Sequence, residues 1–248
     1  AQTFDTNGNI TSRTDWNGNR TNYAYDLTQN LETSRVEALT AVSAATAQTR
    51  SISTQWHASW RLPAKVAEPL RTTNYLYNGD GGLTCGTKAD GATPVPGVLC
   101  AKSVQGTADA TGAAGFGAAT AGAPRTWNYG YNADGKVLTV DGPRTDVSDV
   151  TTYAYYANGD PELGKRGNLA SIANALGQVT QITAYNAHGQ PLTIVDPNGL
   201  ATSLTYDARQ RLTARSVGGE TTSYSYDGVG QLTHVTLPDG SSLAYAYD

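Results

Sequence analysis

The sequence contains no methionine, and phenylalanine, cysteine and charged residues are scarce. Charged side chains make up 15% of the 248 residues, whereas about a quarter is usual for a globular protein, so we expect a polar surface with little charge. No run of about 18 apolar residues is present, which excludes an ordinary transmembrane helix. Because methionine is missing, we expect residue 1 to follow a removed leader or to lie within a longer polypeptide.

Several functional signatures are also missing. The net charge is −4 and no basic cluster occurs, which argues against nucleic acid as the main partner. The three histidines, His57, His188 and His234, are too far apart in sequence to indicate a metal or catalytic set. No phosphate-binding glycine loop is present. We therefore predict no cofactor, no metal site and no catalytic residue.

Tyrosine is abundant, with 15 residues against two phenylalanines. Twelve of the tyrosines form pairs at positions i and i+2, a spacing that places both rings on one face of a strand. Most pairs run directly into Asp or Asn. The pairs are Tyr23/Tyr25, Tyr75/Tyr77, Tyr129/Tyr131, Tyr153/Tyr155, Tyr224/Tyr226 and Tyr245/Tyr247.

These motifs recur with a period near 20 residues, most regularly after residue 185, and follow the template Y-D-x-x-G-x-L-T. Asp or Asn favours a turn, glycine supplies positive φ, and the alternating residues that follow predict a half-buried strand. Each repeat is thus predicted to be about one β-hairpin. The repeat-defining residues are Tyr25, Asp26, Tyr131, Asn132, Gly135, Tyr185, Asn186, Gly189, Tyr206, Asp207, Tyr226, Asp227, Gly230, Tyr247 and Asp248.

The repeats resemble those of the Rhs/YD-repeat family of bacterial proteins, which has relatives in the C component of insecticidal Tc toxins and in animal teneurins. The resemblance rests on residues 131–140, 185–199, 206–219 and 226–240, on Trp56-His57 with residues 61–63, and on residues 142–146 and 195–200. It implies an all-β fold in which tandem hairpins form a curved, spiralling antiparallel sheet, the wall of a hollow shell.

The same resemblance implies a structural function, encapsulation of a C-terminal toxin domain for delivery against other bacteria or a host. The implied partners are the rest of the same chain, its enclosed toxin and a secretion-system spike protein. The implied location is secreted or at the cell surface, after export from a bacterial cytoplasm. Because the repeats here are too few to close a shell, we expect a partial wall.

Two segments interrupt the period, and the sequence divides into residues 1–77 with a long hairpin, a loop-rich insertion at 78–126, and regular repeats at 127–248. A short helix competes with the long hairpin over residues 27–60, and the Thr and Ser content favours the hairpin, with its tip at residues 43–47. Residues 106–122 are predicted to be a mobile loop. Cys85 and Cys100 are expected to form a disulfide, the alternative being two reduced thiols.

Two further motifs have competing interpretations. Trp56, Trp60 and Arg61 form an aromatic-basic cluster that could bind carbohydrate or pack within the sheet, and an extracellular carbohydrate-binding surface is the alternative function. Residues 191–200 match P-x-x-x-x-D-P-x-G-L, which the resemblance associates with self-cleavage. The segment lies inside a regular repeat with further repeats after it, which favours an ordinary turn.

Overall fold

A computed structural model describes all 248 residues, and the protein is all-β. It contains nineteen strands and two short 3-10 helices, η1 (Asp80–Gly82) and η2 (Gly115–Gly117). The strands fall into two compact units, residues 1–148 and 149–248. None of the helical segments is long and apolar enough to cross a membrane.

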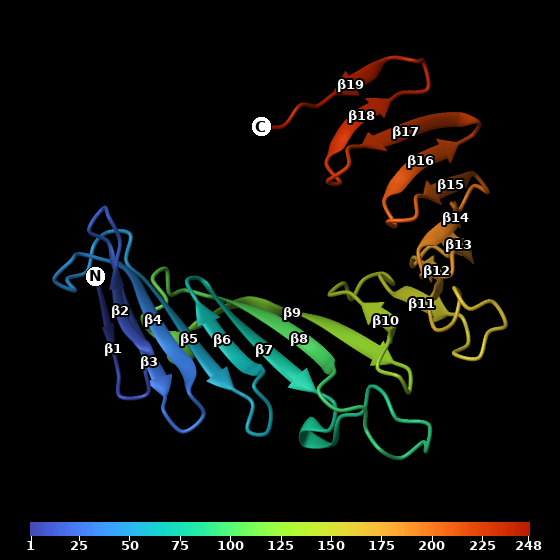
Figure 1. Ribbon diagram of the computed structural model, residues 1–248. Coiled ribbons are helices and arrows are strands. Elements are labelled where there is room, and N and C mark those ends of the chain that lie inside the picture. Colours follow the sequence, from blue (N-terminus) through green and yellow to red (C-terminus); the bar gives the residue numbers. More distant parts are fainter. The chain divides into compact units, whose positions relative to one another are not determined.

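The first unit is an antiparallel meander in which each strand pairs with the next one in the chain (Figure 1). Its strands are β1 (Gln2–Phe4), β2 (Ile10–Thr14), β3 (Arg20–Asp26), β4 (Leu31–Leu39), β5 (Arg50–Trp56), β6 (Pro63–Glu68), β7 (Arg71–Tyr77), β8 (Leu99–Thr107), β9 (Thr120–Tyr131) and β10 (Val137–Asp141).

The second unit repeats this arrangement, again with only sequential antiparallel pairs. Its strands are β11 (Thr151–Tyr155), β12 (Leu169–Ala173), β13 (Val179–Tyr185), β14 (Pro191–Val195), β15 (Ala201–Tyr206), β16 (Leu212–Val217), β17 (Glu220–Tyr226), β18 (Leu232–Thr236) and β19 (Ser242–Ala244). Both units therefore consist of the tandem hairpins that the sequence predicts.

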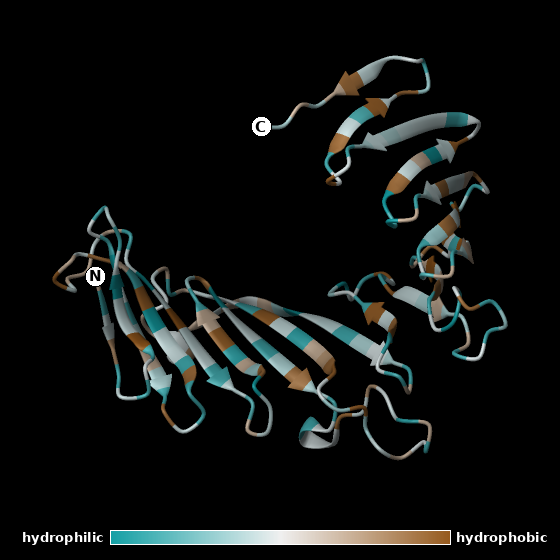
Figure 2. Cartoon of the chain, in the orientation of Figure 1, coloured by the Kyte–Doolittle hydropathy of each residue, from teal (hydrophilic) through white to brown (hydrophobic).

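Neither unit has a conventional hydrophobic core, and no large side chain is fully buried. Apolar residues form short bands along the strands instead of one cluster (Figure 2). The accessible surface is 14490 Å², whereas a compact protein of 26.0 kDa would expose about 10,500 Å². The strands therefore form single layers that leave much of both faces uncovered.

Both interruptions of the repeat contain strands. Residues 27–60 contain β4 and β5, so the long hairpin is confirmed and the short helix is wrong. The loop predicted over residues 106–122 is shorter in the structure, because β8 continues to Thr107 and β9 begins at Thr120. The three-part division at residues 77 and 126 stays a prediction, since the compact units meet instead at residues 148 and 149.

Candidate functional sites at the Tyr-Asp turns

An aromatic residue ends the first strand of each repeated hairpin, except in β3, where Tyr25 is the last residue but one. It pairs with the first residue after the turn, and the next residue along is an extra one that forms a β-bulge; in the last copy Tyr226 pairs with Leu232 and Ser225 with His234. The same register holds at eight of the nine copies, and at Tyr25 the pairing continues for one more residue, with Tyr25 opposite Glu32 and Asp26 opposite Leu31. A bulge occurs at all nine, so it is part of the repeat. The aromatic residues are Phe4, Tyr25, Trp56, Tyr77, Tyr131, Tyr155, Tyr185, Tyr206 and Tyr226.

The turn after the aromatic residue is held by one Asp or Asn side chain. Its Oδ1 accepts the backbone N–H groups two and four residues later, at 2.8–3.0 Å. These bonds satisfy donors that the turn would otherwise expose. Eight turns share the pattern: five follow an aromatic residue directly, at Asp5, Asn132, Asn186, Asp207 and Asp227, and three follow another residue, at Asp15, Asn174 and Asp196.

The hydrogen bonds that the turn carboxylates accept favour their ionised form. The side-chain amide of Asn19 and the N–H groups of Asn19 and Asn17 lower the pKa of Asp15, and Asn9 does the same for Asp5. Asn132 and Asn186 make equivalent bonds without any charge. Charge at this position is therefore dispensable for the turn geometry.

The tyrosine hydroxyls join successive repeats. The Tyr226 hydroxyl donates to the carbonyl of Leu212, and the Tyr247 hydroxyl donates to the carbonyl of Leu232. In each pair the acceptor is the first residue after the turn of the preceding repeat. The same type of bond links Tyr77 to Pro63, Tyr131 to Leu99 and Tyr185 to Leu169, with O···O distances of 2.6–2.8 Å.

Neighbouring turns also touch each other along this edge of each unit. In the second unit the Gln190 side chain donates to the carbonyl of Gln210, and Arg209 donates to the carbonyl of Gly228. In the first unit Arg61 donates to the carbonyl of Gln29. Each turn therefore supports the next, which is what an array of marginal hairpins needs for stability.

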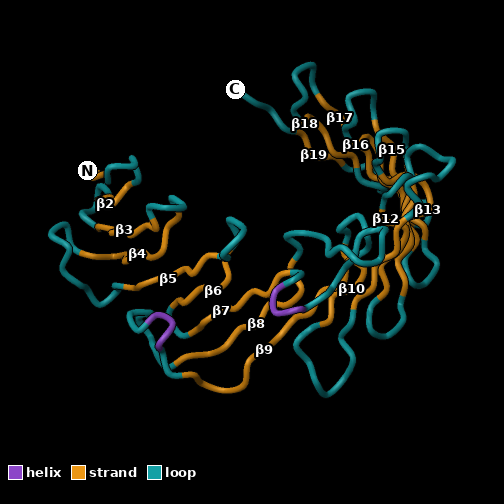
Figure 3. Tube along the Cα trace, turned by 90° about the horizontal axis from the view of Figure 1, so that it is seen from below, coloured by secondary structure: helices purple, strands orange, loops and turns teal.

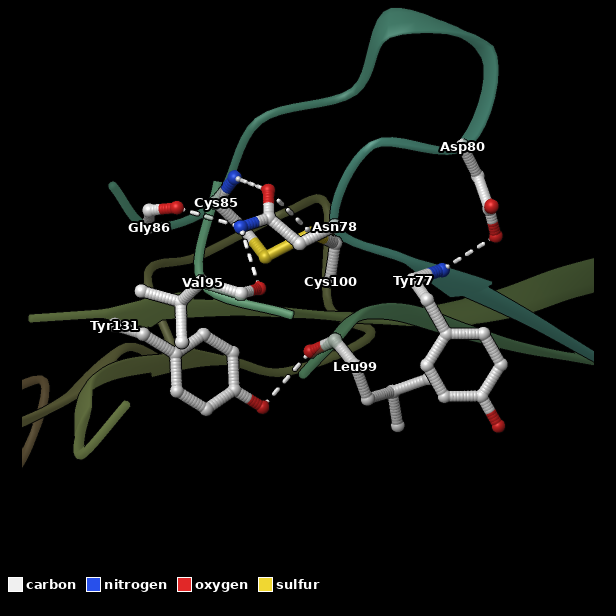
Figure 4. Close-up of a disulfide and its surroundings, with 9 residues drawn as sticks. All are labelled: Tyr77, Asn78, Asp80, Cys85, Gly86, Val95, Leu99, Cys100 and Tyr131. Carbon is white, nitrogen blue, oxygen red and sulfur yellow. Dashed lines mark hydrogen bonds between the residues drawn. A yellow bond between two sulfur atoms is a disulfide. The ribbon is translucent and has the colours of Figure 1, made fainter. Parts of the chain in front are cut away.

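The largest departure from the repeat is an insertion into the turn after Tyr77. The N–H of Asn78 bonds the carbonyl of Val98, as it would bond the residue four positions later in a plain turn. The structure joins Cys85 and Cys100 in a disulfide with a Cα–Cα distance of 5.4 Å (Figure 4). Cys100 occupies the bulge position, since Leu99 pairs with Tyr77 and Ala101 with Leu76.

Asn78 organises this inserted loop from within. Its side chain is 3% exposed, its Oδ1 accepts the N–H of Cys85, and its Nδ2 donates to the carbonyls of Gly86 and Val95 (Figure 4). Val95 and Cys100 beside it are also buried. The disulfide and the amide thus close one small buried cluster in a protein that has few others.

An imidazole connects the same loop to the preceding turn. His57 Nε2 lies 2.9 Å from Asp80 Oδ1, and His57 Nδ1 accepts the N–H groups of Ser59 and Trp60. Because Nδ1 is an acceptor, the Nε2 proton is the one donated to Asp80. Burial opposes ionisation of Asp80, yet the bonds from His57 and from the N–H of Tyr77 lower its pKa overall.

The predicted aromatic-basic cluster is not one surface. Trp56 Nε1 donates to the carbonyl of Glu32, and Trp60 stacks on His57 with ring centroids 4.4 Å apart and meets Tyr77 edge-on. Arg61 is held by the carbonyl of Gln29. All three side chains make contacts within the sheet, and their role in carbohydrate binding stays a proposal.

The motif at residues 191–200 forms β14 and a regular turn. Asp196 Oδ1 accepts the N–H groups of Asn198 and Leu200, and the N–H of Gly199 donates to the carbonyl of Asp196. This carboxylate therefore has the same bonding as its counterparts at the other turns.

Sequence reasoning missed several copies of the turn. Trp56-His57 is a repeat in which His57 replaces Asp, and its Nδ1 takes the place of the carboxylate oxygen. Asp15 and Asn174 form the same turn at the opposite ends of their strands. Asp15 and Asn174 both begin a D/N-x-x-G motif. A search for that motif without the preceding tyrosine would have found them.

Comparison with known proteins agrees with this geometry. The family model described as RHS Repeat matches residues 185–221, 215–242 and 226–248. Among solved structures, TcdB2-TccC3 without its hypervariable C-terminal region matches 95% of this chain with a TM-score of 0.66 and 15% identity. The Photorhabdus luminescens Tc holotoxin pore with the TccC3-D651A mutation matches 93% with a TM-score of 0.53 and 17% identity. No curated protein matches the chain.

The chain is thus a protein of tandem β-hairpins in which aromatic-Asp turns, bulges and hydroxyl bonds repeat in one register. Its last 64 residues, 185–248, match the RHS Repeat model, and over 93–95% of its length it shares the fold of the solved TccC3-containing structures. It corresponds to 11–12% of the length of the solved chains it matches.

Proposed function

We propose that this chain is a section of a shell wall that encloses a toxin domain and protects it during export from a bacterium. The observation that supports this most is the single-layer sheet of RHS-type hairpins. A layer with two exposed faces has little use as an isolated globular domain, whereas a wall needs one face toward its contents and one toward solvent. The contacts between successive turns supply continuity along such a wall.

The partners that this proposal requires are further repeats of the same polypeptide, the enclosed toxin domain and a secretion-system spike protein. Low charge on the wall suits a structural role, since a strongly charged surface would retain cargo of opposite sign. The proposal assigns no catalytic residue to this chain.

The test is limited proteolysis of the full product of the gene, followed by electron microscopy. We expect a hollow particle in which a toxin segment resists protease while folded and becomes sensitive when the shell is opened with denaturant. Digestion of that segment at equal rates in native and opened protein would contradict encapsulation. A gene neighbourhood with a downstream immunity gene would support the export role.

A further inference from the structure

The β8–β9 loop, residues 108–119, folds back onto β5 and β6, and we refer to it as the strap (Figure 3). The N–H of Leu70 donates to the carbonyl of Asp109, and the N–H of Ser51 donates to that of Thr111, both at 2.7 Å. The Phe116 ring of the strap lies 5.2 Å from Lys65 Nζ on β6. The strap is therefore held near its start by two backbone hydrogen bonds and further along by the Phe116 side chain.

The strap fits so closely that one position admits only glycine. A Cβ on Gly112 would lie 2.1 Å from the carbonyl oxygen of Ser51, and the residue has a φ of +76°. Gly122, at the start of β9, has a similar φ of +70° but no atom within 4 Å of such a Cβ. Alanine at either position would strain the backbone, but only alanine at residue 112 would also displace the strap. Comparing the two substitutions therefore separates these effects.

Phe116 closes one side of a pocket of about 490 Å³ on the first unit. This volume lies within the range typical of small-molecule sites. The opposite sides are formed by the turn after Tyr25 and by the end of β5. The lining side chains that matter for binding are Asp26, Gln29, Ser53, Gln55, Trp56 and Phe116.

The polar side chains of the pocket have unused hydrogen-bonding capacity. Asp26 uses Oδ1 for the N–H groups of Thr28 and Gln29, which leaves Oδ2 without a protein donor. The side-chain amides of Gln29 and Gln55 and the hydroxyl of Ser53 have no partner within the protein. Amides both donate and accept, so these groups match ligand hydroxyls, which also do both.

The lining also distinguishes between ligand classes. It contains one carboxylate and no basic side chain, and of the nearby cations Arg61 is bound to the carbonyl of Gln29 while Lys65 Nζ lies over the Phe116 ring. A neutral ligand avoids the repulsion that the Asp26 carboxylate would exert on an anion. A single carboxylate is too few for a calcium site, which takes six to eight oxygens. Trp56 and Phe116 add apolar surface suited to the C–H face of a sugar ring.

We propose that this pocket binds a neutral saccharide unit, with Gln29, Gln55 and Asp26 Oδ2 bonded to its hydroxyls and Phe116 against its ring. The proposal does not depend on the shell function and would hold for a wall segment or for an isolated repeat surface. Because the pocket is small and open, we expect Kd values on the order of 1 mM.

The test is saturation-transfer NMR titration of the 248-residue chain with neutral trisaccharides of glucose, galactose and N-acetylglucosamine, and with a sulfated heparin disaccharide. We expect at least one neutral trisaccharide to bind, and Gln55→Ala or Gln29→Ala to weaken that binding by roughly tenfold. Gln181→Ala, which removes an exposed glutamine on β13, is the matched control and should change nothing.

Gly112→Ala should weaken saccharide binding by displacing the strap, whereas Gly122→Ala should not. Each variant is first compared with the parent chain by circular dichroism to confirm folding. Failure of every neutral saccharide to bind would overturn the proposal. So would binding that survives both glutamine substitutions, and preference for the sulfated disaccharide would show that the assigned ligand class is wrong.

Discussion

At the scale of single residues, the turns differ in how well each sequence suits the shared geometry. The fourth position of the turn has positive φ, from 76° to 84° at Gly177, Gly189 and Gly199. Gln210 occupies this position after Asp207 with a φ of +64°. A residue with a Cβ is strained there by about 1 kcal/mol or more.

We predict that Gln210→Gly stabilises the second unit by up to about 1 kcal/mol, the relief of strain being partly offset by greater freedom of the unfolded chain. The opposite change, Gly230→Ala, should destabilise it by about 1 kcal/mol, because φ is +102° while a Cβ would meet only Arg211 Nη1, at an ordinary contact distance of 3.5 Å. Urea unfolding curves measure both. If both variants changed the free energy of unfolding in the same direction, this account of the turn would be contradicted.

The tyrosine hydroxyl gives a second prediction at this scale. Tyr226→Phe keeps the ring, against which Arg211 lies 4.5 Å from the centroid, and removes only the bond to the carbonyl of Leu212. We expect a loss of about 0.5–1.5 kcal/mol in the free energy of unfolding. Tyr206→Phe is the control, because the Tyr206 hydroxyl makes no such bond, and it should cost clearly less.

The turn carboxylates predict how stability depends on pH. The pKa values of Asp5 and Asp15 are lowered from 3.8 by the bonds they accept. A carboxylate whose pKa is lower in the folded than in the unfolded protein contributes its full stabilisation at pH values above the unfolded pKa. This contribution is lost as the pH falls through the folded pKa. We expect Asp5→Asn with Asp15→Asn to lose less stability between pH 7 and acid than the parent chain, measured by urea unfolding at each pH.

Asparagine is tolerated at this position, as Asn132 and Asn186 show, so the double variant should fold at pH 7. Asp248→Asn at the chain end is the matched control for removal of charge. An unchanged acid dependence in the double variant would mean that other carboxylates govern unfolding in acid.

At the scale of elements, the hairpins could be predicted because each carries its own local signals. Tyr-Asp, the glycine three residues after Asp, and the alternating strand are all within about ten residues of one another, so no long-range information was needed. The bulge position and the hydroxyl bonds could not be predicted, because they depend on the register between strands. The turn at Trp56-His57 was missed because histidine can accept the turn N–H groups in place of Asp only when its ring is oriented toward them.

The inserted loop between Asn78 and Val98 gives a prediction at this scale. We expect intact mass to rise by two hydrogens on reduction, and the double variant Cys85→Ala/Cys100→Ala to lose about 3 kcal/mol, the loop-closure value for 15 residues. Hydrogen exchange should increase in residues 78–98 and stay unchanged in residues 149–248. A mass that does not change with reductant would show that the two thiols are free.

At the scale of the whole molecule, the sequence predicted a repeat array, and the array explains the missing core. Because every residue pairs mainly with the adjacent hairpin, stability is a sum of neighbour contacts instead of one buried centre. The sequence could not reveal the strap or its pocket, since residues 108–119 carry no periodic signal and their position depends on β5 and β6.

An array of this type leaves strand edges open in the 248-residue polypeptide. The pairing of β19 is with β18, on one edge, and Leu243 on β19 is 54% exposed. Such edges template pairing with another chain. We therefore predict that the polypeptide associates with itself as its concentration rises, measured by light scattering after gel filtration.

Leu243→Lys should reduce the association, because a charge on an edge strand opposes edge-to-edge pairing. Val229→Lys replaces an apolar residue of a turn that is even more exposed, at 84%, and should leave the association unchanged. Equal effects of the two substitutions would mean that general surface hydrophobicity, and not the open edge, drives association.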